Sequence, residues 1–260
     1  MNKDTTRQVI NVGATLITLV VNILANALPF NGQNTGEISD RFQVYFVPAG
    51  YVFSIWGVIY LGLIAFAIYQ ALPAQRENPS LRHIGYLYAL TCLANSVWIF
   101  LWHYNVFALT VIAMLVLLLA LIAIYLLLGI GRERVSQAEK WMVHLPFSIY
   151  LGWITVATVA NITDLLYYVN WSGWGISPQA WAVIMLIAAA AIASAVALTR
   201  RDVGYTLVIL WAFAGIAVKQ AAARPVAIAA IVMALAVALA LARGVSQSRS
   251  QGAKSGLKRS

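Results

Sequence analysis

About eight long apolar runs, each near the roughly 20 residues that an α-helix needs to cross a bilayer core, restrict the fold of this sequence more than any other feature. In lipid, only helices and closed barrels satisfy all their backbone polar groups. The predicted spans are Gln8–Leu28, Gly50–Leu72, Ile84–Trp102, Phe107–Ile130, Trp141–Tyr168, Pro178–Thr199, Gly204–Lys219 and Pro225–Ala242. The sequence therefore predicts an all-α, polytopic helical membrane protein.

Composition supports this class and excludes others. Of the 260 residues, 62% are hydrophobic and only 10% are charged, whereas about a quarter of the residues in a soluble domain are charged. A soluble globular domain, a disordered chain and a fibrous repeat are therefore excluded. The single cysteine, Cys92, also excludes a disulfide framework and a cysteine-based metal site.

Lysine and arginine are distributed unevenly between the predicted loops, which indicates how the chain crosses the membrane. With the N-terminus inside, the inner segments carry Lys3, Arg7, Arg76, Arg82, Arg132, Arg134, Lys140, Arg200, Arg201, Arg243, Arg249, Lys254, Lys258 and Arg259, and the outer ones carry Arg41, Lys219 and Arg224. Positive residues concentrate on the cytoplasmic side. We therefore expect a multi-pass protein of the bacterial plasma membrane with both termini in the cytoplasm. The net charge of +9 then reflects topology and predicts no nucleic-acid partner.

Polar and aromatic residues recur at helical spacing in the first, second, third and fifth spans. They are Asn11, Thr15, Thr18, Asn22 and Asn26; Trp56 and Tyr60; Thr91, Asn95, Trp98 and Trp102; and Tyr150, Trp153, Ala157, Asn161, Asp164 and Tyr168. Such stripes face the interior of a helix bundle. They could serve as hydrogen bonds between helices or line a ligand cavity. The Trp and Tyr rings favour the cavity, because bulky rings pack poorly at close helix crossings and line pockets for flat ligands.

The remaining segments carry weaker signals. The fourth span is almost purely aliphatic and is predicted to face lipid, while the sixth and eighth are rich in alanine, which allows close helix packing. Asp164 is the only acid inside a predicted span, where it could contact a ligand at the pocket mouth or bond a nearby polar side chain. Residues 244–260 are predicted to form a disordered, basic cytoplasmic tail.

Four short motifs occur in order along the predicted helices. They are Pro48–Trp56 followed by Tyr60, Asn95–Trp98, Pro146 with Trp153–Ala157 and Asn161, and Asn170–Trp171. Together they resemble the TspO/MBR family of tryptophan-rich sensory proteins and translocator proteins, over residues 8–171. The chain departs from the family pattern in spacing: Phe53 to Trp56 is shorter and Pro146 to Trp153 is longer.

The resemblance implies a five-helix transmembrane bundle over residues 1–171 that binds porphyrins, haem-type tetrapyrroles or other flat apolar ligands. It places ligand-binding residues at Trp56, Tyr60, Asn95, Trp98, Trp153, Ala157 and Asn161, and we add Asn22, Asn26 and Asp164 as further polar lining. Residues 172–243 would then add about three transmembrane helices that the family lacks. A sensor or regulator with a small hydrophobic ligand and no required cofactor is the function this implies.

No motif in the sequence indicates catalysis. There is no HExxH, CxxC or paired-carboxylate pattern, and His83, His103 and His144 lie near the ends of different spans. We therefore assign no catalytic or metal-binding residue. Two other functions remain open: transport of small hydrophobic molecules, and a structural role in a larger membrane complex. In the structural role, a complex partner would dock on the last three predicted spans. The resemblance also implies a homodimer, whose contact the extra helices could block or replace.

Overall fold

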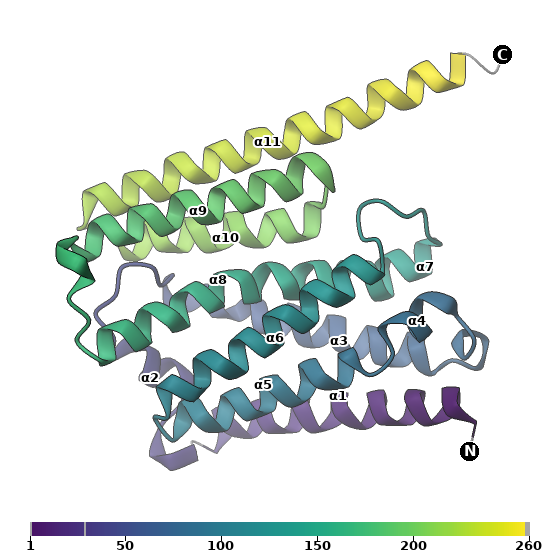
Figure 1. The fold of residues 1–260 in the computed structure, drawn as a ribbon, viewed down its shortest axis with the longest axis horizontal. Coiled ribbons are helices and arrows are strands. Elements are labelled where there is room, and N and C mark those ends of the chain that lie inside the picture. The colour runs from purple at the N-terminus through teal and green to yellow at the C-terminus, as the bar shows by residue number, and fades with distance from the viewer. Residues whose placement is uncertain (1, 29, 258–260) are drawn as a thin grey trace. The chain divides into compact units, whose positions relative to one another are not determined.

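The computed structural model describes residues 2–28 and 30–257, which fold into helices without any strand (Figure 1). The long helices are α1 (Lys3–Ala27), α3 (Ile55–Ala71), α5 (Leu87–His103), α6 (Phe107–Leu127), α8 (Leu145–Tyr168), α9 (Pro178–Thr199), α10 (Val203–Lys219) and α11 (Arg224–Leu257). The short ones are α2 (Thr35–Asp40), α4 (Pro79–Ile84) and α7 (Gln137–Glu139), with 3₁₀ turns at Phe30–Gly32, Gly50–Ser54, Pro73–Gln75 and Gly173–Gly175.

The lengths and compositions of these helices confirm an all-α, polytopic membrane protein. Six helical stretches within the described residues are long and apolar enough to cross a bilayer, and α5 and α10 are shorter apolar helices. The eight predicted spans correspond to these eight long helices. The second span differs at its start, because Gly50–Ser54 form a 3₁₀ turn before α3 begins at Ile55.

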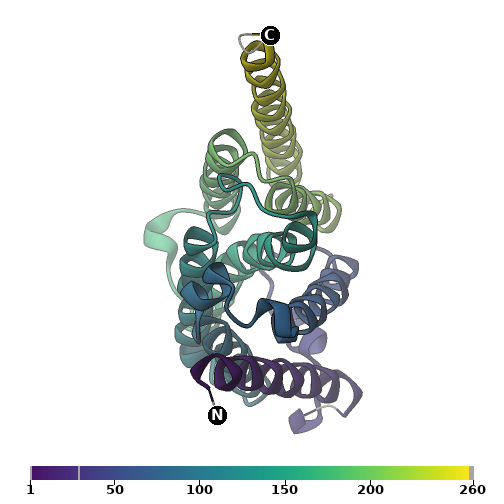
Figure 2. The ribbon, with the colours of Figure 1, turned by 90° about the vertical axis from the view of Figure 1, so that its right-hand side faces the viewer.

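The chain divides into two compact units, each described here by itself. The first comprises Met1–Val44 and Phe53–Ser172. Within it, α1 packs on α3, α3 on α8, α8 on α6, α6 on α5, and α5 again on α1. These contacts close a ring of five helices, which Figure 2 views close to end-on. The polar stripes of α1, α5 and α8 are mostly buried in this unit.

A widened helical turn precedes α8. Residues Lys140–His144 form a π-helical segment, in which the Leu145 N–H donates to the carbonyl oxygen of Lys140. Pro146 follows immediately; a proline has no N–H and its ring clashes with the carbonyl four residues earlier, so the turn before it opens. On α3, Gly62 lies against this proline, and a Cβ added there would come within 3.1 Å of the Pro146 Cβ.

The second unit contains Tyr45–Val52 and Gly173–Ser260. Its helix α9 packs on α11, and α10 contacts both. The buried face of α9 is formed largely by alanines, and a Cβ at Gly244 of α11 would lie 2.5 Å from the carbonyl oxygen of Ala197. The alanine-rich helices therefore approach each other closely, as their composition predicts.

Residues 45–52 belong to the second unit, whereas the sequence-based division at residue 171 places them in the first. They pack with the C-terminal helices: the Ala49 N–H donates to the Gly215 carbonyl at 3.1 Å, and the Trp211 indole N–H donates to the Val52 carbonyl at 3.1 Å. Gly215 permits this approach, since a Cβ there would meet a methyl group of Val52.

Helix α11 also extends beyond its predicted end. The sequence predicts that the span stops at Ala242 and that residues 244–260 form a disordered tail, whereas α11 is continuous from Arg224 to Leu257. Residues 258–260 of the predicted tail lie outside the described residues. No proline occurs after Pro225, and Ser, Gln, Lys and Arg are all compatible with helix. The polar composition of the tail therefore does not prevent the helix from continuing.

Candidate functional site

The polar stripe of α1 is buried, and much of it bonds to α5 and the turn before it. Asn11, Thr15, Thr18 and Asn22 are each at most 2% exposed. Asn11 donates to the Gly85 carbonyl at 3.3 Å. The hydroxyls of Thr15 and Tyr88 share a hydrogen bond of 2.7 Å, and Thr18 donates to the Cys92 carbonyl at 3.1 Å. Most of this stripe therefore acts as hydrogen-bonding contact between helices.

Asn22 joins three helices through side chains alone. Its amide nitrogen donates to the Asn95 side-chain oxygen on α5 at 2.7 Å, and its own oxygen accepts from the Tyr60 hydroxyl on α3 at 2.8 Å. The same nitrogen also donates to the Thr18 carbonyl at 2.8 Å. These bonds link Asn95 and Tyr60, both predicted site residues, through a residue predicted only as lining.

Five aromatic side chains from α3, the turn before it and α8 form a ring cluster: Phe53, Trp56, Tyr60, Tyr150 and Trp153. Trp56 and Tyr60 are stacked, with ring centroids 5.6 Å apart. Trp153 meets Trp56 edge-on at 6.2 Å and Phe53 at 5.5 Å. Trp56 and Tyr60 are half-buried, whereas Trp153 is only 2% exposed. The cluster thus runs from the interior of the first unit toward its surface.

The indole N–H of Trp153 differs from the other polar groups described above in its hydrogen bonding. It is buried and has no hydrogen-bond partner. A buried donor without an acceptor costs about 1–3 kcal/mol, and most native indole N–H groups find a partner. A molecule that places an acceptor beside Trp153 would remove this cost.

A second polar contact lies further along α8. The Trp98 indole N–H donates to the Asn161 side-chain oxygen at 3.2 Å, and the Asn161 nitrogen donates to the Thr110 hydroxyl on α6 at 3.0 Å. Trp98 also stacks on Trp102, with centroids 5.2 Å apart. Thr110 was not predicted, because a single threonine in an aliphatic span gives no periodic signal. Through it, α6 buries one face and does not simply face lipid.

The structure thus brings Trp56, Tyr60 and Trp153 into one cluster and pairs Trp98 with Asn161. Ala157 lies half-buried between Trp153 and Asn161 on α8, and Asp164 follows on the same helix with 3% exposure. Asn26 does not join them: it is exposed and donates to the Asn22 carbonyl of its own helix at 2.9 Å. The sequence missed Phe53 and Thr110 as parts of these clusters.

Comparison with known proteins identifies one family. A family model described as "TSPO-like protein" matches residues 8–243. No match was found among curated proteins or among solved structures. The matched range continues past Trp171 and includes α9, α10 and α11 up to Arg243. The three C-terminal helices therefore lie inside the matched range, and the similarity is not confined to the first five long helices.

Proposed function

This chain belongs to the TSPO-like family of membrane proteins, and we propose that its ring cluster binds a flat, largely apolar ligand of the porphyrin or tetrapyrrole type. The observation that carries the proposal is the buried indole N–H of Trp153, which has no partner and lies beside the Trp56 ring. A ligand with a conjugated apolar face and a polar edge matches both features.

The hydrogen bonds already made in this region limit how such a ligand binds. The Asn95 oxygen is taken by Asn22 and the Asn161 side chain by Trp98 and Thr110. The Trp153 N–H is therefore the donor that we expect to meet the polar edge of the ligand. The half-buried rings of Trp56 and Tyr60 supply the flat contact surface, so binding requires no chemistry from the protein.

A sensory or regulatory role is supported by Tyr60, which belongs to the ring cluster and also bonds to another helix. Its ring stacks on Trp56, and its hydroxyl holds Asn22, which in turn holds Asn95. A ligand that displaces the Tyr60 ring would strain or break the hydrogen bond to Asn22. Occupancy of the ring cluster would thus alter the contacts of α3 with α1 and α5, which a partner protein could detect.

Titration of the detergent-purified protein with protoporphyrin IX tests this proposal, with the ligand's own absorbance as the readout. Trp153→Phe removes the N–H while keeping an aromatic ring, and we expect the dissociation constant to rise about tenfold. Combining it with Trp56→Phe should weaken binding further. Trp141→Phe is the matched control, because Trp141 is 61% exposed in the same unit. Equal binding by the double variant and the parent would show that the ring cluster is not the site.

A further inference from the structure

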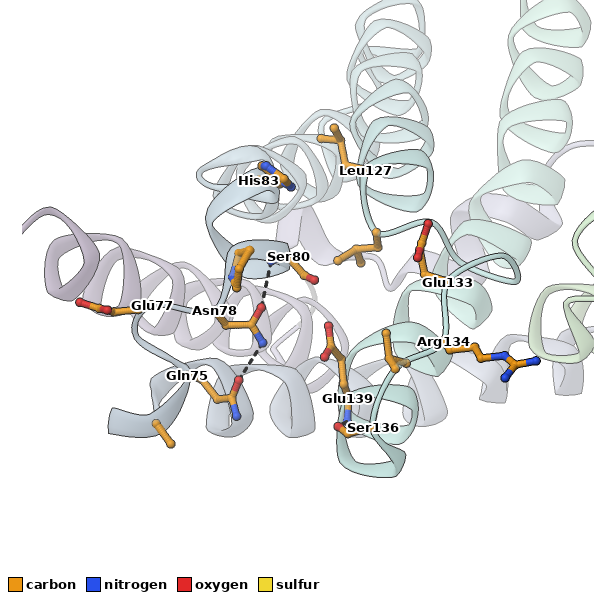
Figure 3. A pocket seen from close by; sticks show the side chains of 14 residues that line it. Gln75, Glu77, Asn78, Ser80, His83, Leu127, Glu133, Arg134, Ser136 and Glu139 are labelled. Atoms are coloured by element: carbon orange, nitrogen blue, oxygen red, sulfur yellow. Dashed lines mark hydrogen bonds between the residues drawn. The ribbon is translucent and has the colours of Figure 1, made fainter.

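A polar pocket of about 840 Å³ lies at one end of the first unit, apart from the ring cluster (Figure 3). Its walls come from the connection between α3 and α5, residues 74–83, and from the connection between α6 and α8, residues 127–139. The Lys and Arg distribution predicts that both connections face the cytoplasm. Ligand sites are commonly 300–1,000 Å³, so the pocket is large enough for a small solute.

Glu139 is the buried charged residue of this pocket. It is 9% exposed, and its side-chain oxygen Oε1 is buried without a hydrogen-bond partner. In Figure 3 the carboxylate points toward the middle of the pocket. Burying a carboxylate oxygen without a hydrogen-bond donor is costly. The Glu139 backbone N–H, by contrast, donates to the Ser136 hydroxyl at 3.1 Å. The backbone of Glu139 is thus held in place, while its Oε1 atom accepts no hydrogen bond.

The charges around Glu139 leave the pocket acidic. Glu133 and Glu77 also line it, and the Glu133 side chain occupies the space that a Cβ on Gly129 would fill. The lining residue Arg134 directs its guanidinium away from the centre in Figure 3. Arg82 lies 3.7 Å from the exposed Glu77 but is bound to Asp4 at 2.6 Å; that bond raises the pKa of Arg82.

We propose that this pocket binds a small organic cation with primary ammonium groups, of the polyamine class, from the cytoplasm. An ammonium group donates three hydrogen bonds and carries a positive charge that pairs with the negative charge of the Glu139 carboxylate. Gln75 and Asn78, which bond to each other at 2.8 Å, and the Ser80 hydroxyl add polar contacts in the wall. Among the described residues no three His, Cys, Asp or Glu side chains converge as metal ligands, which favours an organic cation over a metal ion.

Calorimetric titration of the full-length protein with spermidine at low ionic strength tests the proposal. We expect saturable binding by the parent and a dissociation constant at least about tenfold higher for Glu139→Gln, which removes the charge but keeps the shape. Glu37→Gln is the matched control, because Glu37 lies outside the pocket in a capping box that glutamine also forms. Its affinity for spermidine should equal that of the parent.

A second variant keeps the test decisive if Glu139→Gln does not fold. Leu127 lines the pocket and is 49% exposed, so Leu127→Trp should fill space while leaving the carboxylate intact, and it should weaken spermidine binding. The proposal is overturned if the parent shows no saturable binding, or if the folded pocket variants bind spermidine as tightly as the parent. Binding of Mg²⁺ in place of spermidine, lost in Glu139→Gln, would also overturn it. The porphyrin titration uses other residues, so the two proposals fail independently.

Discussion

At the scale of single residues, the interior of the first unit depends on which polar groups have partners. Asn22 uses both ends of its amide on neighbouring helices, whereas the buried Trp153 N–H has no partner. The sequence predicted that both residues face inward, because helical spacing determines the face. It could not predict which inward groups pair with each other, because pairing depends on the rotation and offset of α1, α3 and α5. That information distinguishes a helix contact from a ligand contact.

Asn22→Ala should destabilise the protein by about 1–2 kcal/mol, because it leaves the Tyr60 hydroxyl and the Asn95 oxygen without the partner they have now. Asn26→Ala is the matched control on the same helix, since Asn26 is exposed and donates to the Asn22 carbonyl within α1; it should change stability by less than about 0.5 kcal/mol. Denaturation of the detergent-purified variants by SDS measures the difference. Equal effects of the two changes would contradict the role given to Asn22.

At the scale of elements, the positions of the helices follow from the apolar runs, while the ways they begin and meet do not. Pro146 lies inside the predicted span 141–168, yet the structure places a π-helical turn before it. Gly50 opens a 3₁₀ turn and not α3. Such details depend on local hydrogen bonds that hydropathy does not report. Close helix contacts at glycine likewise become visible only when the facing residue, such as Pro146 opposite Gly62, is known.

Gly62→Leu should destabilise the first unit by about 1–3 kcal/mol, because the added side chain must displace the rigid Pro146 ring and separate α3 from α8. Gly57→Leu provides the comparison within the same helix. Nothing lies within 4 Å of a Cβ at Gly57, and leucine favours helix more than glycine by up to about 1 kcal/mol, so that variant should be as stable as the parent or more so. Thermal unfolding in detergent reports both, and a Gly62→Leu protein as stable as Gly57→Leu would exclude the close contact.

At the scale of the whole molecule, the sequence predicted the class and the eight long helices, but not every partner of each segment. Segment 45–52 packs with helices that follow it by more than a hundred residues, and no local pattern reports so distant a pairing. The Glu139 pocket escaped prediction for a similar reason. Its carboxylates come from separate connections that look like ordinary charged loops in the sequence.

The orientation of the molecule decides which compartment supplies the ligand of that pocket, and it can be tested at the two ends of one helix. Gln137 and Ser172 are both exposed and flank the segment that includes α8, so single changes Gln137→Cys and Ser172→Cys place one thiol before and one after it. Because Lys and Arg concentrate in the segments predicted inside, a membrane-impermeant maleimide should label Ser172→Cys in intact cells and Gln137→Cys only after permeabilisation. The parent, whose single Cys92 is 3% exposed, should stay unlabelled in both conditions. Labelling of Gln137→Cys in intact cells would reverse the topology and place the Glu139 pocket on the outer side, where cytoplasmic polyamines do not reach it.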